Sequence, residues 1–322
     1  MKVRTFGRTG WPVSEIGYGM WGMGGWSGSD DAESLASLHR AVELGCTFFD
    51  TAYAYGQGHS ERLLGQLVKA HPDRRLIVAT KVPPKNLRWP ARAQDPLEDT
   101  FPEAHIVEYA DLSLQHLGLE RLDLLQLHVW DDAWAADPAW RRAAERLKQS
   151  GKIGAFGISL NRWQPENALA AIATGAVDAV QVVYNVFDQA PEDRLFPACR
   201  EQGVAVIARV PFDEGSLTGA LTGDSRWPEG DWRNTYFNPA HLAATLERVE
   251  RLRPHVPPDS TMADTALRFI LANPDVSTAI PGMRKTRHVE ANLAASGRGT
   301  LPAVTLAGLR AQRWDRVPNT TP

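Results

Sequence analysis

The chain of 322 residues is 43% hydrophobic and 23% charged, with a formal net charge of −3 at pH 7. This composition supports a large buried core and gives no electrostatic basis for binding nucleic acid or an anionic membrane. The two cysteines, Cys46 and Cys199, stand in unrelated contexts, which argues against a disulfide scaffold or a structural metal site. We find no signal segment and no run of about 18 apolar residues, so we expect a cytoplasmic protein without a membrane span.

Short apolar strands alternate with amphipathic helices along the chain, after a small N-terminal β-hairpin formed by 3–6 and 11–13. The expected strands cover 15–19, 47–50, 76–81, 122–127, 153–158, 179–183, 204–208 and 276–280. The expected helices cover 31–44, 60–69, 103–117, 139–149, 166–173, 191–202, 239–253, 261–272, 283–293 and 303–314. A Pro-rich segment at 83–102 is expected to be a surface loop.

This alternation predicts that the strands pair in parallel, with helices packed on them. Eight strand–helix units favour a closed (β/α)₈ barrel, with the hairpin at its bottom and a C-terminal helix, over an open doubly wound sheet. We expect residues 1–322 to form a single domain. The stretch 17–22 matches the pattern G-x-G-x-x-G literally, but no helix begins at its third glycine. We therefore interpret it as a barrel loop and not as a Rossmann fingerprint.

Polar residues close three consecutive apolar strands, at Asp50, Lys81 and His128, and Tyr55 follows the first of them. In a barrel these positions converge on one mouth, where active sites lie. Each residue alone has a structural explanation: a helix cap, a solvated strand end, a core histidine or aromatic packing. The four together, in this order, favour a catalytic site.

The combination fits proton transfer to a carbonyl group. Tyr55 would donate the proton, and Lys81 would lower the phenol pKa from its ordinary value of about 10. Asp50 would keep Lys81 charged and oriented, while His128 would hydrogen-bond the carbonyl oxygen. Because no side chain can donate a hydride, this chemistry requires a nicotinamide cofactor.

Six motifs resemble those of the aldo-keto reductase superfamily, in the same order and over essentially the whole chain. They cover residues 50–56, 79–82, 113–128, 151–159, 181–185 and 280–284. Their layout is similar to that of the branch that includes potassium-channel beta subunits. The resemblance implies reduction of an aldehyde or ketone to the alcohol by an NADP-dependent enzyme, with Tyr55 rather than Tyr53 as the proton donor.

The resemblance also implies a site for the nicotinamide cofactor. Ser159 and Gln181 match positions that bind the nicotinamide carboxamide, and 212–217 matches the loop over the pyrophosphate. The implied cofactor residues are Gly19, Met20, Trp21, Asp50, Ser159, Gln181, Arg209, Phe212, Gly215, Ser216, Leu217, Gly282, Arg284, His288 and Asn292. The basic stretch 284–287 opens a helix, where backbone N–H groups favour an anion, so we expect NADP(H) in preference to NAD(H).

Three positions depart from the family pattern. Leu160 separates Ser159 from Asn161, the usual partner of the carboxamide, and Ala291 replaces a common glutamate. Arg209 stands where an aromatic residue commonly stacks on the nicotinamide. A guanidinium there can stack on the ring, favour release of the oxidised cofactor, or recruit an anionic substrate.

The expected substrate is a small carbonyl compound bound by aromatic side chains at the barrel mouth: Trp21, Tyr53, Trp89, Trp130 and a loop carrying Trp227 and Trp232. This mouth suits apolar or sugar-like carbonyls. One alternative is an NADP(H)-binding redox sensor or regulatory partner protein on the same barrel. Another is an aldolase that uses Lys81 as a Schiff base. The substrate itself, the direction of the reaction and the oligomeric state stay open.

Overall fold

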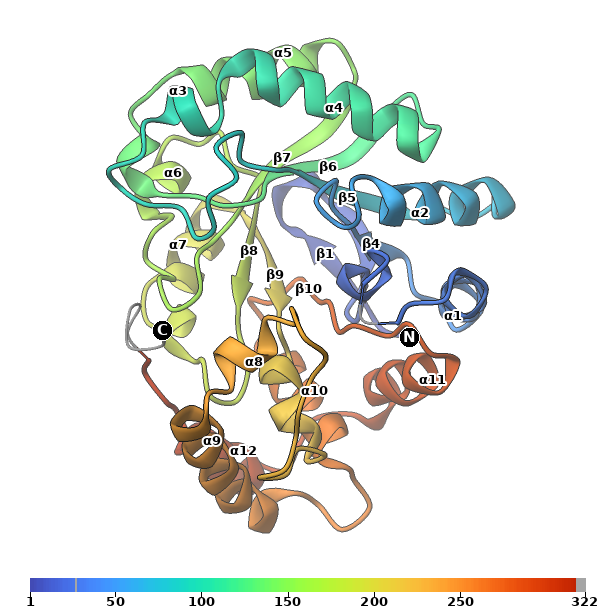
Figure 1. Cartoon of the computed structure of the whole chain (residues 1–322), viewed down its shortest axis with the longest axis vertical. Helices are drawn as coiled ribbons and strands as arrows, with labels where there is room; N and C mark the ends of the chain where they lie inside the picture. Colours follow the sequence, from blue (N-terminus) through green and yellow to red (C-terminus); the bar gives the residue numbers. More distant parts are fainter. Residues whose placement is uncertain (27, 317–322) are drawn as a thin grey trace.

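Eight parallel strands form the centre of the computed structural model, which describes residues 1–26 and 28–316 (Figure 1). They are β3 (Tyr18–Gly19), β4 (Phe48–Asp50), β5 (Ile77–Val82), β6 (Leu122–Leu127), β7 (Ile153–Ser159), β8 (Ala179–Val183), β9 (Ala205–Arg209) and β10 (Thr278–Ala279). Each strand pairs with the next in chain order. Parallel bridges from Ile16 to Ala279 and from Gly19 to Gly282 join the first strand to the last. The barrel is therefore closed, as the sequence predicts.

Helices surround the barrel and follow most of the strands. The longer ones are α1 (Asp31–Glu43), α2 (His59–Ala70), α4 (Glu103–Leu117), α5 (Ala139–Gln149), α7 (Leu195–Gln202), α9 (Pro239–Leu252), α10 (Met262–Leu271), α11 (Thr286–Ala294) and α12 (Ala303–Arg310). The shorter ones are α3 (Leu97–Thr100), α6 (Leu169–Ala173) and α8 (Arg233–Tyr236). Side-chain caps fix several starts; for α1, Asp30 accepts a hydrogen bond from the backbone N–H of Glu33.

Three helices begin later than the sequence pattern predicts. Helix α6 starts at Leu169, α7 at Leu195 and α11 at Thr286. Before α11 the backbone is drawn into the barrel wall, because Gly19 N–H donates to the carbonyl of Pro281 at 3.0 Å and Gly19 bridges to Gly282. Residues used for barrel closure cannot also form the first turn of a helix, so the expected start at 283 is wrong.

The N-terminal hairpin closes the end of the barrel at which the strands begin. Its strands, β1 (Val3–Phe6) and β2 (Trp11–Ser14), pair antiparallel, and a 3₁₀ turn at Gly7–Thr9 connects them. Phe6 is fully buried, with its ring centroid 5.3 Å from that of Phe48. Gly7 has φ +50°, and a Cβ there would lie 2.5 Å from the carbonyl oxygen of Gly203. Only glycine fits this close approach.

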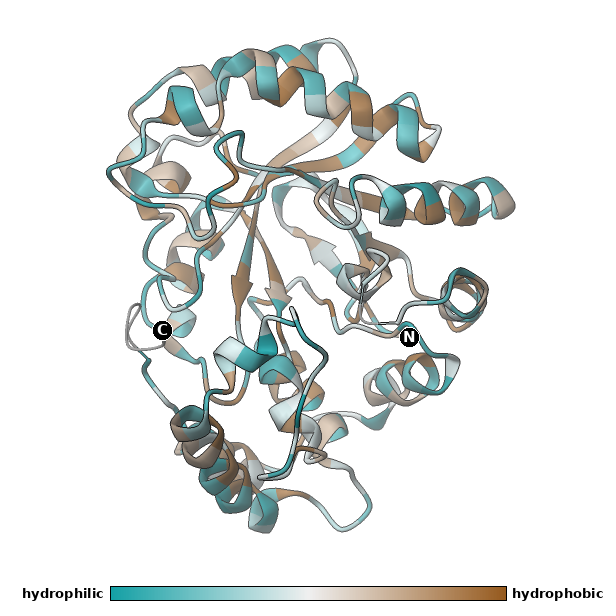
Figure 2. Ribbon diagram, viewed as in Figure 1, coloured by the Kyte–Doolittle hydropathy of each residue, from teal (hydrophilic) through white to brown (hydrophobic). Residues whose placement is uncertain are grey.

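The barrel interior changes from apolar to polar along its axis. Because side chains alternate along a strand, every second residue points inward. The lower interior is a cluster of Phe6, Val13, Phe48, Ile77, Ala79, Leu124, Ala155, Ala179, Ala205, Ile207 and Ile280. Two residues farther along their strands, Asp50, Lys81 and Gln126 continue these inward-facing rows. The alternate residues face the helices, and Figure 2 shows hydrophobic strands at the centre.

Candidate active site

A buried ion pair lies at the carboxyl ends of β4 and β5. The Lys81 Nζ atom is 2.5 Å from Oδ2 of Asp50 and donates to the carbonyl of Thr51 at 2.8 Å. The same Nζ lies 3.5 Å from the hydroxyl of Tyr55. Lys81 is fully buried and Asp50 almost so. The three residues that the sequence analysis brought together are thus in contact through one ammonium group.

Two buried amides hold the second oxygen of Asp50. Gln181 Nε2 donates to Oδ1 of Asp50 at 2.8 Å, and Gln126 Nε2 does so at 3.2 Å. Gln181 therefore binds the carboxylate in this structure. Sequence reasoning missed Gln126, although its position two residues before His128 gave a signal. Gln126 faces the barrel interior from β6, and a glutamine buried in a largely apolar strand needs a polar partner.

Burial has the largest effect on the pKa of Tyr55. At Lys81, burial opposes the effect of the ion pair on the pKa. Burial disfavours the charge of Lys81, but Asp50 and Tyr55 outweigh it and raise the pKa of Lys81. Burial also raises the pKa of Tyr55 above its ordinary value, and the lowering effect of Lys81 only partly offsets this. Lys81 lowers the pKa of Tyr55, as expected, but it does not bring that pKa below its ordinary value, because desolvation of the phenolate is the larger effect.

His128 lies beside Tyr55 and is partly buried. Its ring centroid is 5.5 Å from that of Tyr55 and 4.5 Å from that of Trp89, with both pairs edge to face. Burial, with the charges of Lys81 and Arg209, holds the pKa of His128 well below its usual value. The imidazole is therefore neutral near pH 7. Its Nδ1 is buried and has no hydrogen-bond partner among the described residues.

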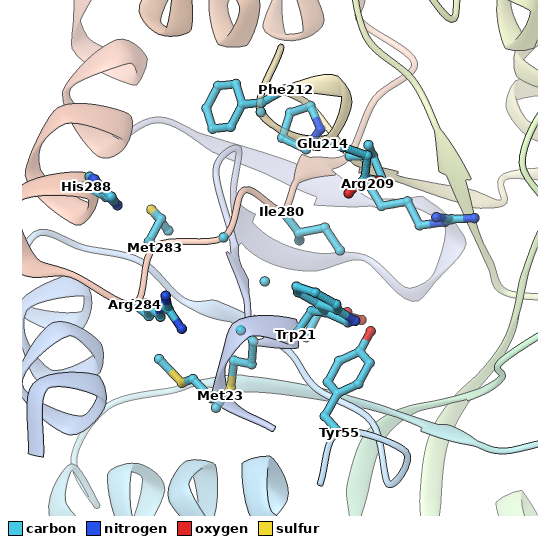
Figure 3. A pocket seen from close by; sticks show the side chains of 18 of the residues that line it. Trp21, Met23, Tyr55, Arg209, Phe212, Glu214, Ile280, Met283, Arg284 and His288 are labelled. Carbon is cyan, nitrogen blue, oxygen red and sulfur yellow. The ribbon is translucent and has the colours of Figure 1, made fainter. Parts of the chain in front are cut away.

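Two cavities meet at Tyr55. The first, of about 460 Å³, extends from Asp50 and Tyr55 to Arg284 and His288. The second, of about 600 Å³, contains His128 and the aromatic mouth. Both are lined by Trp21, Tyr55, Arg162, Gln181, Arg209 and Trp232. Figure 3 shows Arg284 and His288 at one end of the first cavity, and Tyr55 with Arg209 toward the other.

Most of the expected cofactor residues line the first cavity: Gly19, Met20, Trp21, Asp50, Gln181, Arg209, Phe212, Gly215, Gly282, Arg284 and His288. Ser159 lines the second cavity. Three other expected cofactor residues line neither cavity. Ser216 and Leu217 are fully buried, with the Ser216 hydroxyl donating to Asp213 at 2.8 Å, and Asn292 is buried on α11.

The far end of the first cavity fits an anionic nucleotide. Arg284 Nη1 is buried and has no hydrogen-bond partner among residues 1–26 and 28–316. A Cβ added at Gly282 would meet nothing within 4 Å, which leaves the backbone there open to a ligand. No side chain caps the N-terminus of α11, so its first N–H groups are free to bind a phosphate.

Only part of the expected substrate pocket lies at the mouth. The expected residues Trp21, Trp89 and Trp232 line the second cavity. Trp26 lines it as well, although the sequence analysis did not select it. Trp130 does not: it is fully buried and packs against Trp134 and Trp140. The expected role of Trp130 in the mouth is therefore not supported, because its ring turns outward to the helices.

Tyr53 also points away from the site. Its ring centroid is 4.7 Å from that of Tyr109 and 5.7 Å from that of His116, both on α4. Asn161 holds the Pro-rich loop instead of facing the cofactor region, through hydrogen bonds to both backbone groups of Ala91 at 3.0 and 3.1 Å. The departure at 160–161 thus gives the asparagine a structural contact.

The loop after β9 is fixed by charged contacts that sequence reasoning missed. Asp213 and Glu214 have φ of +43° and +58°, uncommon for residues other than glycine. Glu214 forms an ion pair with Arg162. Asp213 accepts from Arg316 at 3.0 Å, and Arg316 also binds Asp188. The far end of the described chain therefore holds the loop that borders the first cavity.

The closed parallel barrel defines a (β/α)₈ protein. Its buried polar groups lie at the carboxyl ends of the strands, so the candidate site is at the end of the barrel where enzymes of this fold have their active sites. The chain belongs to the aldo/keto reductase family, because the model of that family matches residues 15–311. Members of this family are oxidoreductases of carbonyl compounds. The resemblance noted in the sequence is therefore confirmed.

Curated relatives match over most of their length. The NADH-specific methylglyoxal reductase of Escherichia coli is 28% identical over 315 residues, covering 92% of this chain and 93% of that protein. The aldo-keto reductase yakc of Schizosaccharomyces pombe, named with NADP(+), is 30% identical over 298 residues, covering 88% and 84%. The holo form of aldo-keto reductase AKR11C1 from Bacillus halodurans superposes with a TM-score of 0.78 at 28% identity, covering 100% of this chain and 99% of that one.

In the described residues, no helix is both long and apolar enough to cross a membrane.

Proposed function

We propose that this protein reduces an aldehyde or ketone to the alcohol with NADPH, and that residues 1–322 act as one catalytic domain. The observation that carries the proposal is the position of Lys81. Its ammonium group joins the Asp50 carboxylate to the Tyr55 hydroxyl at the point where a nucleotide-sized cavity meets an aromatic one. A proton donor, its charged support and an adjacent binding cavity are what carbonyl reduction requires.

Each residue of the group has a role that its surroundings support. Tyr55 donates its proton to the carbonyl oxygen, and the phenolate that forms is stabilised by Lys81. Asp50 keeps Lys81 charged, and Gln126 and Gln181 orient Asp50. Neutral His128 has a hydrogen-bonding nitrogen available for the same carbonyl oxygen, which orients the substrate. A bound nicotinamide supplies the hydride.

Our preference for NADPH rests on Arg284. Its buried Nη1, which has no hydrogen-bond partner in the described part of the chain, suits the extra phosphate that distinguishes NADPH from NADH. One relative is named NADH-specific and another is named with NADP(+), so the family alone does not decide the cofactor. Within the first cavity, Gly19, Phe212 and Gly215 would border the middle of the nucleotide.

The aldolase alternative is disfavoured by the state of Lys81. A Schiff-base lysine must lose its proton, and desolvation normally lowers its pKa for this purpose. Here the contact with Asp50 raises the pKa of Lys81 in spite of burial. The ammonium is also held by three oxygen atoms. Lys81 therefore serves as a charged support and not as a nucleophile.

The test is a titration of the purified protein with NADPH and NADH, followed by tryptophan fluorescence, together with turnover of 4-nitrobenzaldehyde. We expect tighter binding of NADPH and turnover that Tyr55→Phe lowers by at least about 100-fold, as for loss of a general acid. Tyr53→Phe is the matched control, because Tyr53 packs against α4 outside the cavities. It should keep activity within about twofold.

Binding of NADPH without turnover of any carbonyl compound would favour the redox sensor or regulatory protein. Failure to bind either nucleotide would overturn the proposal entirely. Equal loss of activity in Tyr53→Phe and Tyr55→Phe would show that the effect is structural and would remove Tyr55 as the proton donor.

A further inference from the structure

Arg209 is a half-buried cation at the junction of the two cavities, and it has no ion-pair partner among the described residues. It ends β9 and lines both cavities, together with Tyr55. Its guanidinium donates one hydrogen bond, from Nη2 to the carbonyl of Leu160 at 2.8 Å. Its Nε is buried and has no partner in the described parts of the chain. A guanidinium that is partly removed from water is normally paired with an acid, so Arg209 has hydrogen-bonding capacity for an anionic ligand.

The charges around Arg209 leave the second cavity positive. Arg162 also lines this cavity, but Glu214 pairs with it from the first-cavity side. No aspartate or glutamate is among the described residues that line the second cavity. Burial and the neighbouring Arg162 lower the pKa of Arg209 to about 10, so Arg209 stays protonated at neutral pH. His128, in the same cavity, is neutral.

With the nicotinamide near Tyr55, the phosphates of a bound cofactor would lie farther from this position than the reacting ring does. Arg284, which suits the extra phosphate of NADPH, lies at the other end of the first cavity, as Figure 3 shows. The nicotinamide end, which must lie near Tyr55 for hydride transfer, is neutral when reduced and positive when oxidised. Two like charges in a poorly solvated site repel each other, so an anion beside Arg209 is needed most when the oxidised cofactor is present.

We propose that the substrate carries a carboxylate in addition to its carbonyl group, and that Arg209 binds this carboxylate. The inference rests on the proposed reductase function and specifies its substrate class. The planar guanidinium can bind a carboxylate through two hydrogen bonds from its terminal nitrogens. The aromatic side chains of the mouth, Trp21, Trp89 and Trp232, would contact the apolar part of the substrate.

The test compares aldehydes that differ only in charge: 2- and 4-carboxybenzaldehyde, and the methyl ester of each. We expect the wild type to prefer at least one acid over its ester by at least about tenfold in kcat/KM. Arg209→Gln should lower kcat/KM for that acid by about 10- to 100-fold, as for hydrogen bonds to a charged group, and change the ester by less than about threefold. Arg209→Lys keeps the charge without the planar fork and should be intermediate.

Arg200→Gln serves as a control, because Arg200 lies on α7 with a largely exposed side chain paired to Asp275. It should leave the acid-to-ester ratio unchanged. Binding of benzoate and of benzamide to the NADP⁺-loaded protein, followed by tryptophan fluorescence, gives a readout independent of turnover. Benzoate should bind more tightly than benzamide in the wild type, and Arg209→Gln should abolish the difference.

The outcomes separate the two proposals. Turnover of acids and esters at similar rates, with no benzoate preference, would overturn the carboxylate site and leave the reductase intact. NADPH binding without turnover of any of the four aldehydes would overturn the reductase, and the substrate class with it. If circular dichroism shows that Arg209→Gln does not fold, the proposal is tested with Arg209→Lys and by comparing the binding of benzoate and benzamide to the wild type.

Discussion

Lys81 and Asp50 form an ion pair that is almost completely removed from water, with Nζ and Oδ2 2.5 Å apart. Such a pair is costly to desolvate, and its contribution to stability is clearest when one partner is removed. The amides of Gln126 and Gln181 bind the other oxygen of Asp50, so the carboxylate keeps its full set of partners only while Lys81 is present.

Removal of one member of this pair is predicted to destabilise the fold strongly. Lys81→Met leaves a buried, uncompensated carboxylate and should lower the free energy of unfolding by about 3–5 kcal/mol, measured by urea denaturation. The double variant Lys81→Met with Asp50→Asn should recover a large part of this loss, because no buried charge remains. A double variant that is less stable than either single variant would contradict this account.

His128 is predicted to make the fold sensitive to acid. Its pKa is held well below the usual value. As the pH falls below about 6.5, the unfolded chain therefore binds a proton at His128 while the native state does not. Stability should therefore decrease with falling pH, by at most about 1.4 kcal/mol per pH unit from this residue. Urea denaturation of His128→Asn between pH 7 and 5 should show a shallower decrease.

The remaining slope is expected from three other histidines, His105, His241 and His288, whose pKa values burial also lowers. Identical slopes for the wild type and His128→Asn would show that His128 is not the residue that resists protonation.

Arg316 is predicted to affect both stability and NADPH binding, although it lies far from Tyr55 in the sequence. Its side chain is buried and joins Asp188 and Asp213, and it donates to the hydroxyl of Tyr236 at 2.8 Å. Arg316→Met should lower the free energy of unfolding by about 3–5 kcal/mol, because two carboxylates lose their partner. The same variant should weaken NADPH binding by at least about tenfold, since Asp213 belongs to the loop that borders the cavity.

Arg313→Gln is the matched control for Arg316. Its ion pairs with Asp193 and Asp315 are at the surface, so its loss should change stability by no more than about 1 kcal/mol. Urea denaturation and NADPH titration measure both variants. Similar effects of the two substitutions would mean that burial of Arg316 has no special consequence.

Much of the barrel could be predicted because its determinants are local. Short apolar strands, cap residues and the spacing of polar strand ends each lie within a few residues of one another, and the closed sheet follows from their repetition. Asp50, Lys81 and His128 were predicted to converge for the same reason: parallel strands bring their carboxyl ends to one edge.

The partners of these residues were harder to predict, because they depend on contacts across the fold. The contact between Gln181 and Asp50 spans 131 positions of the chain, and that between Arg316 and Asp213 spans 103. Trp130 and Tyr53 follow their strands as the pattern indicates, yet their rings turn toward helices. A side chain beyond the end of a strand is free to rotate, so alternation no longer fixes its direction. The direction in which the pKa of Tyr55 shifts depends on the extent of burial, which the sequence does not quantify.

The contact between Arg316 and the loop at 213–215 also has a consequence during synthesis on the ribosome. Translation delivers Asp50, Tyr55, Lys81 and His128 within the first half of the chain, whereas Arg316 emerges near the end of the printed sequence. The nascent barrel can therefore assemble its ion pair well before the loop beside the first cavity has its last anchor. A nascent chain interrupted before Arg316 would carry all four of these residues on an incompletely held cofactor loop.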